Sequence, residues 1–319
     1  ILDAYTHVAY VCRRHHGTQG TEVRVTLDPS QPPTNDHSTV VTIGTPTAWV
    51  IIRVLVESPE DLAAARRLQR SIEVIAPKAH PSARTERVGR ATEIAQSGAA
   101  VFEELHQYVR LDPPAAWHPK LSAAARAIIE DPTSISIEDR GAGVEEGERR
   151  LRGLSGADTA RQNGWRTGRH ATGFEGDIFR RAAGAKFGLG GHQAIENRSY
   201  IAECDAAGGA LNGDQRLCLK FVGGQFPPCR GFWSLTAYGT ALYLVENEID
   251  RWSMSDRTPG LVYAADGSLT IEISAARPES PANWLPAPSG SYLLGLRVYE
   301  GNASVVTCDW FPPALDPQG

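Results

Sequence analysis

The chain has 319 residues, a hydrophobic fraction of 41%, a charged fraction of 22% and a formal net charge of −5. This balance is typical of a globular protein of two or three domains, each large enough to bury a core. The charge offers no general basic surface for nucleic acid, and no apolar run reaches the roughly 18 residues of a membrane span.

The cysteines indicate packing rather than metal binding. Cys12, Cys204, Cys218, Cys229 and Cys308 are scattered and form no C-x-x-C pair, the spacing that structural zinc sites use. We expect small buried side chains at these positions, and neither a metal nor a cofactor. The odd number leaves at least one thiol unpaired or intermolecular. No signal peptide is visible, so a cytoplasmic and a periplasmic or secreted location both stay open.

The first 56 residues predict β-structure. Apolar and polar residues alternate over 23–27, which is the period of a half-buried strand. Residues 28–36 are rich in proline and short polar side chains and predict a loop. β-branched and apolar residues return over 39–43 and 48–56 and predict two further strands.

The sequence changes to a helical period at Ser58. The serine is a typical helix N-cap, Pro59 suits the first helical position, and two acids follow in the first turn. Apolar residues then recur at helical spacing and predict one buried stripe: Leu62, Ala65, Leu68, Ile72 and Ile75. Further helices are predicted over 92–110, 120–130, 144–154 and 175–187, the third of them exposed and carrying ion pairs.

From about Tyr200 the pattern is that of short strands with turn residues between them. The predicted strands are 217–222, 232–238, 241–246, 261–263, 269–274, 292–299 and 304–311. Asp266-Gly267 lies between two of these runs and is a strong hairpin marker. Strands at this spacing favour an antiparallel sandwich or a jelly roll.

Five motifs occur in the order found in a known bacterial family. They read G-F-W-S-L-T at 231–236, N-E-I-D-R-W-S at 247–253, D-G-S-L-T-I at 266–271, N-W-L-P-A-P at 283–288 and L-R-V-Y at 296–299. Together they resemble the domain of unknown function numbered 1214, over 176–313. Residues 1 to about 75 resemble the later half of its partner domain, numbered 1254. That resemblance rests on L-D-A-Y-T at 2–6 and T-P-T-A-W at 45–49 leading to Arg53.

The resemblance implies an α+β multidomain protein. It implies an Ig-like β-sandwich part over 1–56, a helical middle region over 57–175 and a jelly-roll-like antiparallel β-sandwich over 176–319. The partner domain usually opens with an Asn-Ala-Asp-Thr-like run, which this sequence lacks. We therefore expect either a shortened member or a chain whose beginning lies outside this sequence. The resemblance implies no established reaction.

Two of the motifs supply candidate ligand-binding residues in loops. Asn283 and Trp284 lie in a turn that two prolines hold rigid, so Trp284 is either a ligand platform or a cap on the core. Asn247 and Arg251 follow a strand, and Arg251 could bind a carboxylate or phosphate with two hydrogen bonds. Asp250 could be a general acid or base if it is buried. The alternative is an ion-paired surface loop.

The strand over 232–238 supplies the other candidates. Ser234, Thr236 and Tyr238 share one face, and Trp233 lies on the other. The polar face lines either a cavity inside the sandwich or a solvated outer surface. Tyr238 would be catalytic in the first case, and Trp233 would bind ligand.

Histidines complete the set of candidates. His192 and His170 flank the last predicted helix and could transfer protons near neutral pH, although a lone histidine is more often structural. His15 and His16 are adjacent, so in a strand they face opposite ways and cannot easily share one metal ion.

These residues favour a cofactor-independent enzyme that acts on a small polar or glycan-like molecule. Acid–base chemistry would use Tyr238, Asp250 and His192 in a cleft of the C-terminal β domain. One alternative is a non-catalytic protein that binds a carbohydrate or another small ligand. The other is a structural protein that assembles as a homo-oligomer through exposed tryptophans.

Overall fold

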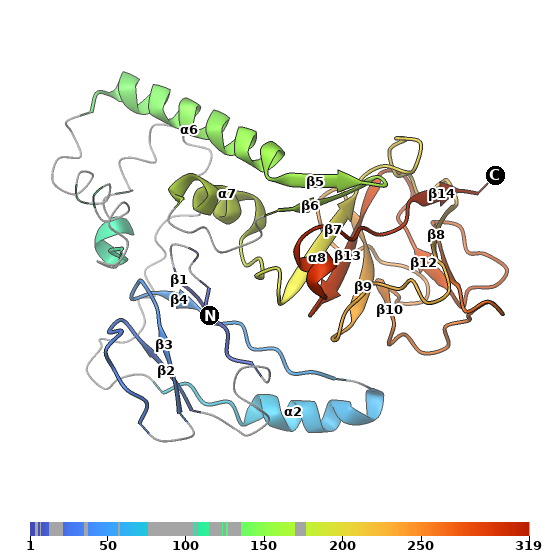
Figure 1. Cartoon of the computed structure of the whole chain (residues 1–319), viewed down its shortest axis with the longest axis horizontal. Helices are drawn as coiled ribbons and strands as arrows, with labels where there is room; N and C mark the ends of the chain where they lie inside the picture. The colour runs from blue at the N-terminus through green and yellow to red at the C-terminus, as the bar shows by residue number, and fades with distance from the viewer. Residues whose placement is uncertain are drawn as a thin grey trace. The chain divides into compact units, whose positions relative to one another are not determined.

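The computed structural model describes residues 1–3, 6, 8–12, 22–34, 38–56, 58–75, 105, 108–114, 123, 126, 135–169 and 177–318. The chain divides into two compact units. The first comprises 1–152 and 175–190, and the second comprises 153–174 and 191–319. The result is a mixed α+β protein rich in antiparallel strands (Figure 1).

The strands described in the first unit form two short sheets. β1 (Leu2–Asp3) pairs antiparallel with β4 (Ala48–Trp49), and β2 (Glu22–Thr26) pairs parallel with β3 (Ser38–Thr42). The strand predicted over 48–56 is therefore confirmed only at its start. Apart from Arg53, residues 50–56 are apolar, yet they are largely exposed, and β-propensity without a pairing strand does not make a strand.

The helices of this unit follow their sequence signals. The 3-10 helix η1 (Pro59–Asp61) has Pro59 in its first turn and continues into α2 (Leu62–Arg70). Of the five apolar residues that predicted a buried stripe, only Ala65 is buried. α6 spans Ile137–Ala157, and α7 spans Ile178–Gly188.

Local contacts account for the two longer helices. On α6, Glu146 pairs with Arg149 at 2.7 Å and with Arg150 at 2.6 Å, which confirms the predicted ion pairs. At the start of α7, the Asp177 carboxylate accepts hydrogen bonds from the backbone of Phe179 and Arg180, as an N-cap does. The helices predicted over 92–110 and 120–130 lie mostly outside the described residues, of which 105, 108–111, 123 and 126 are helical.

The second unit consists of two sheets. The six-stranded sheet has the order β10 (Ser253–Ser255), β9 (Trp233–Gly239), β13 (Tyr292–Tyr299), β7 (Asn197–Ala202), β6 (Trp165–Gly168) and β5 (Thr159–Gln162). The four-stranded sheet has the order β12 (Trp284–Pro286), β11 (Leu269–Ser274), β8 (Leu217–Phe221) and β14 (Leu315–Pro317). All neighbours are antiparallel except β11 and β12.

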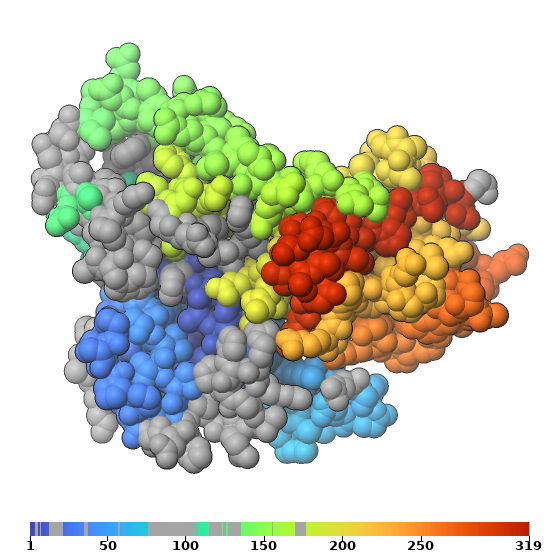
Figure 2. Space-filling model, in the orientation of Figure 1, coloured from blue at the N-terminus to red at the C-terminus, as the bar shows by residue number. Residues whose placement is uncertain are grey.

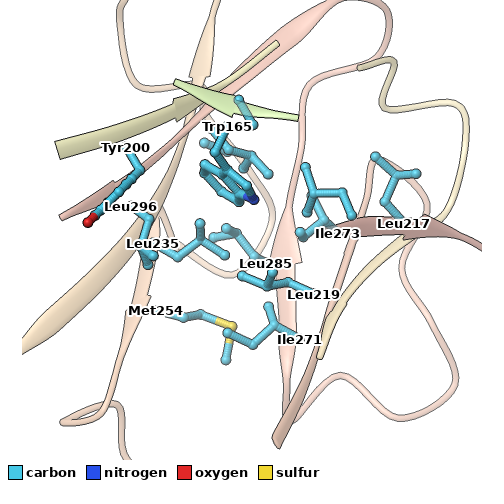
Figure 3. Packing of buried hydrophobic residues seen from close by; sticks show 14 of the residues in the cluster. Trp165, Tyr200, Leu217, Leu219, Leu235, Met254, Ile271, Ile273, Leu285 and Leu296 are labelled. Atoms are coloured by element: carbon cyan, nitrogen blue, oxygen red, sulfur yellow. The ribbon is translucent and has the colours of Figure 1, made fainter. Parts of the chain in front are cut away.

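The core of this unit lies between the two sheets. In β8, β9, β11 and β13 alternate residues are apolar and buried, because one face of each sheet covers the other. Figure 3 shows Leu235, Met254 and Leu296 of the larger sheet facing Leu219 and Ile271 of the smaller one. Each such side chain contributes about 1.5–3 kcal/mol when it is fully buried.

A hairpin from the predicted helical middle completes the larger sheet. β5 and β6 are joined by Asn163 and Gly164, with φ values of 55° and 80°, which are typical of a tight β-hairpin turn. The expectation of helix over 57–175 overlooked this turn signal. The segment after α8 (Ala303–Val306) lies against the hairpin (Figure 2), and Trp165 Nε1 donates a 2.7 Å hydrogen bond to the Pro313 carbonyl.

Three predicted strands are absent from the second unit, all of whose relevant residues are described. Residues 241–246 and 261–263 form loops, and 304–311 begins as α8. The side chain of Asn302 caps α8 by accepting from the backbone of Val305, and this cap prevails over the β-branched pattern. The Asp266-Gly267 turn is confirmed, with Gly267 at φ 75°.

Candidate functional site

The outer face of the six-stranded sheet, which points away from the core, is rich in hydroxyl groups. Leu235 and Met254 point into the core, so their neighbours in β9 and β10 point outward. In register, Ser253 lies opposite Thr236 and Ser255 lies opposite Ser234. We call this surface the hydroxyl face: Ser199, Ser234, Thr236, Tyr238, Ser253 and Ser255. The polar residues of β9 therefore do not line a cavity inside the sandwich.

Arg297 lies at the centre of the hydroxyl face. It is in β13, opposite Ser234 on one side and Ser199 on the other. Its Cζ atom lies 5.4 Å from the centre of the Tyr238 ring, which is a cation–π distance.

Gly295 makes room for this arrangement. A Cβ atom at Gly295 would lie 3.2 Å from Tyr238 Cε2 and 3.3 Å from Arg297 Nη1. The side chains of Tyr238 and Arg297 therefore lie over Gly295, where the sheet has no side chain.

Ser199 and Ser255 of this face have hydrogen-bond partners, but other polar groups of the face are open to a further partner. Within the described part of the chain, Arg297 forms no ion pair and no hydrogen bond, and neither do the hydroxyl groups of Ser234, Thr236 and Ser253. Thr236 is only 7% exposed, so this residue is largely buried from solvent. A guanidinium has five N–H donors and matches carboxylate, sulfate or phosphate oxygens well.

An aromatic stack adjoins this arrangement along β13. Phe232 and Tyr299 stack with ring centres 4.3 Å apart and planes 13° apart, and Arg257 Cζ lies 4.6 Å from the centre of the Phe232 ring. A Cβ atom at Gly231 would lie 2.7 Å from the Tyr299 carbonyl oxygen. The backbones at Gly231 and Tyr299 are therefore close together, and the stacked rings border the hydroxyl face.

The two candidate tryptophans lie in the core. Trp233 is 2% exposed and its ring centre lies 5.3 Å from that of Phe221. Trp284 is 1% exposed, and its Nε1 donates a 3.0 Å hydrogen bond to the Ser274 carbonyl. Neither ring faces solvent, so we assign both to packing and not to ligand binding.

Arg251 is engaged by backbone carbonyls. Its Nη1 atom donates to Pro281 at 2.9 Å, to Ala282 at 3.1 Å and to Trp284 at 2.8 Å. These bonds fasten the loop before β10 to the turn before β12. The geometry supports a structural role for this arginine in place of the predicted carboxylate contact.

Asn247 and Asn283 form comparable backbone contacts. Asn247 Oδ1 accepts from the Arg251 backbone at 2.9 Å, and its Nδ2 donates to the Arg251 carbonyl at 3.1 Å. Asn283 makes the same pair of contacts with the backbone of Val262, at 2.9 and 2.6 Å. Both amides thus hold loops in place, which occupies the groups that a ligand would need.

Tyr238 and His192 lie at opposite ends of the larger sheet. Tyr238 lies opposite Leu293, near the start of β13. His192 precedes β7, whose first residue Asn197 lies opposite Tyr299 at the end of β13. Six residues of strand separate these ends, or about 20 Å, so one catalytic centre cannot include both side chains.

The remaining candidates do not form a metal or catalytic cluster. Asp250 is exposed, with φ 49°, and its carboxylate has no ion pair or hydrogen bond within the described ranges. Those same ranges hold no group of three potential metal ligands and no helix with the length and apolar composition of a membrane span. His170, His15 and His16 lie outside the described residues.

None of the five cysteines, all of which lie among the described residues, forms a disulfide, and each is half-buried. Burial raises the pKa of the Cys218 thiol and raises that of Cys229 to about 11. Neutral thiols in these positions agree with the predicted packing role.

Sequence reasoning missed Arg297, Gly295, Ser199 and Ser253 as site residues. A signal was present in the strand over 292–299, where six of eight residues are apolar or aromatic. Gly295 and Arg297 break that pattern two residues apart, so they share a face. The partners from β7, β9 and β10 became visible only with the strand register.

Comparison with known proteins finds two family models that match parts of the chain. Residues 196–303 match the model of a protein of unknown function (DUF1214), and residues 1–76 match that of another (DUF1254). No curated protein matches the chain.

Two solved structures are similar to the chain. One, from Vibrio parahaemolyticus, is 17% identical with a TM-score of 0.66, over 99% of this chain and 79% of that one. The other, an uncharacterised protein from Burkholderia cenocepacia, is 18% identical over 41% of this chain and 31% of that one, with a TM-score of 0.29. The first likeness supports the fold alone. The family models confirm the predicted resemblance, and the chain pairs a DUF1254 segment at its N-terminal end with a DUF1214 domain in its C-terminal part.

Proposed function

We propose that the hydroxyl face binds a small polar organic molecule, and that an anionic group of this molecule is the part that the protein recognises. The observation that carries the proposal is the position of Arg297. Its guanidinium leans over Gly295 beside Tyr238 and has no acid partner among the described residues.

Charge on the neighbouring strand favours an anion here. Glu203 directly follows the end of β7, and its carboxylate is paired with Arg166 at 2.7 Å. Its charge is therefore largely balanced, which leaves the charge of Arg297 for a ligand. Hydrogen bonds to an ionised group contribute about 1.5–3 kcal/mol, and hydroxyl donors beside the arginine would add to them.

Titration with simple anions tests this proposal. Inorganic phosphate, acetate and glucuronate would be titrated into the wild-type protein and into Arg297→Gln and Arg297→Lys, by calorimetry or NMR. We expect Arg297→Gln to weaken binding at least tenfold. The anion affinity of Arg297→Lys should lie between those of the wild type and Arg297→Gln, because an ammonium group keeps the charge but loses the two-point geometry of the guanidinium.

A matched control uses another arginine of the same unit. Arg230 is exposed and its side chain makes no ion pair with a described residue, so Arg230→Gln should bind these anions as the wild type does. Equal anion affinity in all the variants would contradict the proposal.

Acid–base catalysis on a polar or glycan-like molecule is a second candidate function of the same face. The ring of Tyr238 lies beside the guanidinium, so its phenol adjoins the position proposed for the anion and can both donate and accept a hydrogen bond. If the protein is an enzyme, Tyr238→Phe should bind the ligand and lose turnover, as shown by product analysis. Turnover that survives this change would remove Tyr238 from the mechanism.

We also propose a jelly-roll-like description of the C-terminal domain. Its support is the path of the chain, which passes from β7 in the larger sheet to β8 in the smaller and back to β9 and β10. It then crosses to β11 and β12, returns in β13 and ends in β14. Repeated crossing between two sheets is typical of jelly rolls. The Ig-like description of residues 1–56 stays a prediction.

A further inference from the structure

The loop that follows β9 presents three consecutive large side chains to solvent. Leu242, Tyr243 and Leu244 are 66%, 78% and 52% exposed. We call these residues the 242–244 tip. Single exposed apolar residues need no explanation, but adjoining ones often mark a binding surface.

The tip is tied to the end of β9, directly after the outward-facing Tyr238. The backbone N–H of Gly239, the residue after Tyr238, donates a 3.0 Å hydrogen bond to the Tyr243 carbonyl. The N–H of Leu242 donates to the Gly239 carbonyl at 2.9 Å. Leu242 has φ 64°, a left-handed conformation that leucine rarely adopts. The chain therefore holds a large apolar residue where glycine or asparagine would fit with less strain.

The outer face becomes more apolar from Arg297 towards the end of β9. Next to the row of Arg297 lies the row of Thr236 and Gly295, and next to that lies the row of Tyr238 and Leu293. The tip then follows Gly239. A guanidinium with hydroxyl groups thus grades into aromatic and aliphatic side chains along one direction of the sheet.

We infer that the ligand is an anionic amphiphile, whose acidic group binds Arg297 and whose apolar body lies along Tyr238, Leu293 and the 242–244 tip. This inference rests on the proposed function and adds the class of ligand. Burial of one methylene group contributes about 0.8 kcal/mol, or about fourfold in affinity. Octanoate has six more carbons than acetate, so it should bind roughly sixtyfold more tightly if about half of that chain is buried.

The test compares acetate, octanoate and octan-1-ol on four proteins. These are the wild type, Arg297→Gln, the double variant Tyr243→Ser with Leu244→Ser, and Val262→Ser as a control. Val262 is 59% exposed on another loop of the same unit, so its substitution should leave all affinities unchanged. The tip substitutions are at exposed positions, where changes seldom affect folding.

Three results are expected together. The wild type should bind octanoate much more tightly than acetate or octan-1-ol. Arg297→Gln should lose the difference between octanoate and octan-1-ol, because the acid no longer has its partner. The tip variant should bind acetate as the wild type does and lose most of the gain from the longer chain.

Other results would overturn the inference in distinguishable ways. Acetate binding that depends on Arg297, without a gain for octanoate, would refute the amphiphile and leave the proposed function standing. Absence of binding by any anion would refute both. If octanoate binds no better than acetate and the tip variant alone loses a dimer seen by light scattering, the tip is instead an interface between copies of this chain.

Discussion

Arg297 and Tyr238 come from neighbouring strands, and their side chains meet above Gly295, with the guanidinium carbon 5.4 Å from the centre of the ring. The contact depends on the missing side chain of the glycine, because a Cβ atom there would crowd both groups. The geometry of the hydroxyl face therefore depends on one residue that itself has no polar side chain.

Gly295→Ala should weaken anion binding severalfold with little loss of stability. The new methyl group would lie 3.2 Å from Tyr238 Cε2 and 3.3 Å from Arg297 Nη1, so both flexible side chains must move. Phosphate or acetate titration measures the first effect, and urea unfolding the second. Gly168→Ala is the control, since a Cβ there has nothing within 4 Å. Unchanged anion affinity in Gly295→Ala would argue against a site over this glycine.

Arg251→Met should lower the free energy of unfolding by about 2–3 kcal/mol. Methionine keeps much of the apolar stem and removes the donor that serves the carbonyls of Pro281, Ala282 and Trp284. Denaturant unfolding measures the loss. Arg230→Met, at an exposed position, should stay within about 0.5 kcal/mol of the wild type. If Arg251→Met is as stable as this control, the three hydrogen bonds do not fasten the loop.

Trp284→Phe should destabilise the protein by about 2 kcal/mol, because it removes buried volume and the hydrogen bond to the Ser274 carbonyl. Trp252→Phe is the matched change at a ring that is 38% exposed and should alter stability by less than about 0.5 kcal/mol. Thermal unfolding distinguishes the two. A ligand role for Trp284 would appear instead as lost binding at unchanged stability.

Cys229 should make the folded state less stable in alkali. Burial raises the pKa of its thiol from an ordinary 9.0 to about 11, so above pH 9 the unfolded chain releases this proton while the folded chain keeps it. The stabilisation is fully present below pH 9 and is lost as the pH rises through 11. The stability advantage of the wild type over Cys229→Ala should therefore shrink between pH 9 and 11.

The same thiol gives a chemical readout. Because the thiolate is the reactive form, alkylation of Cys229 by iodoacetamide in the folded protein should be slow at pH 8. Its rate should rise steeply towards pH 11, as followed by peptide mass analysis. Rapid alkylation at pH 8 under native conditions would show that the thiol is not held neutral by burial.

Local sequence patterns determined much of the C-terminal fold. The strands β8, β9, β11 and β13 lie where period-2 alternation predicted them, because alternation records directly which face is buried. Pro59 marks the start of η1, and the Asp266-Gly267 turn occurs where its residues require it. The ordered motifs were enough to identify the two paired domains.

Tertiary structure alone decided what the polar motif residues do. Arg251, Asn247 and Asn283 matched a ligand-binding pattern, yet their partners are backbone groups of other loops. Arg297 meets Ser199 and Ser234 only through the pairing of strands distant in sequence. A side chain's local neighbours fix its face, whereas its hydrogen-bond partners depend on strand register and loop closure, which are set by contacts across the whole domain.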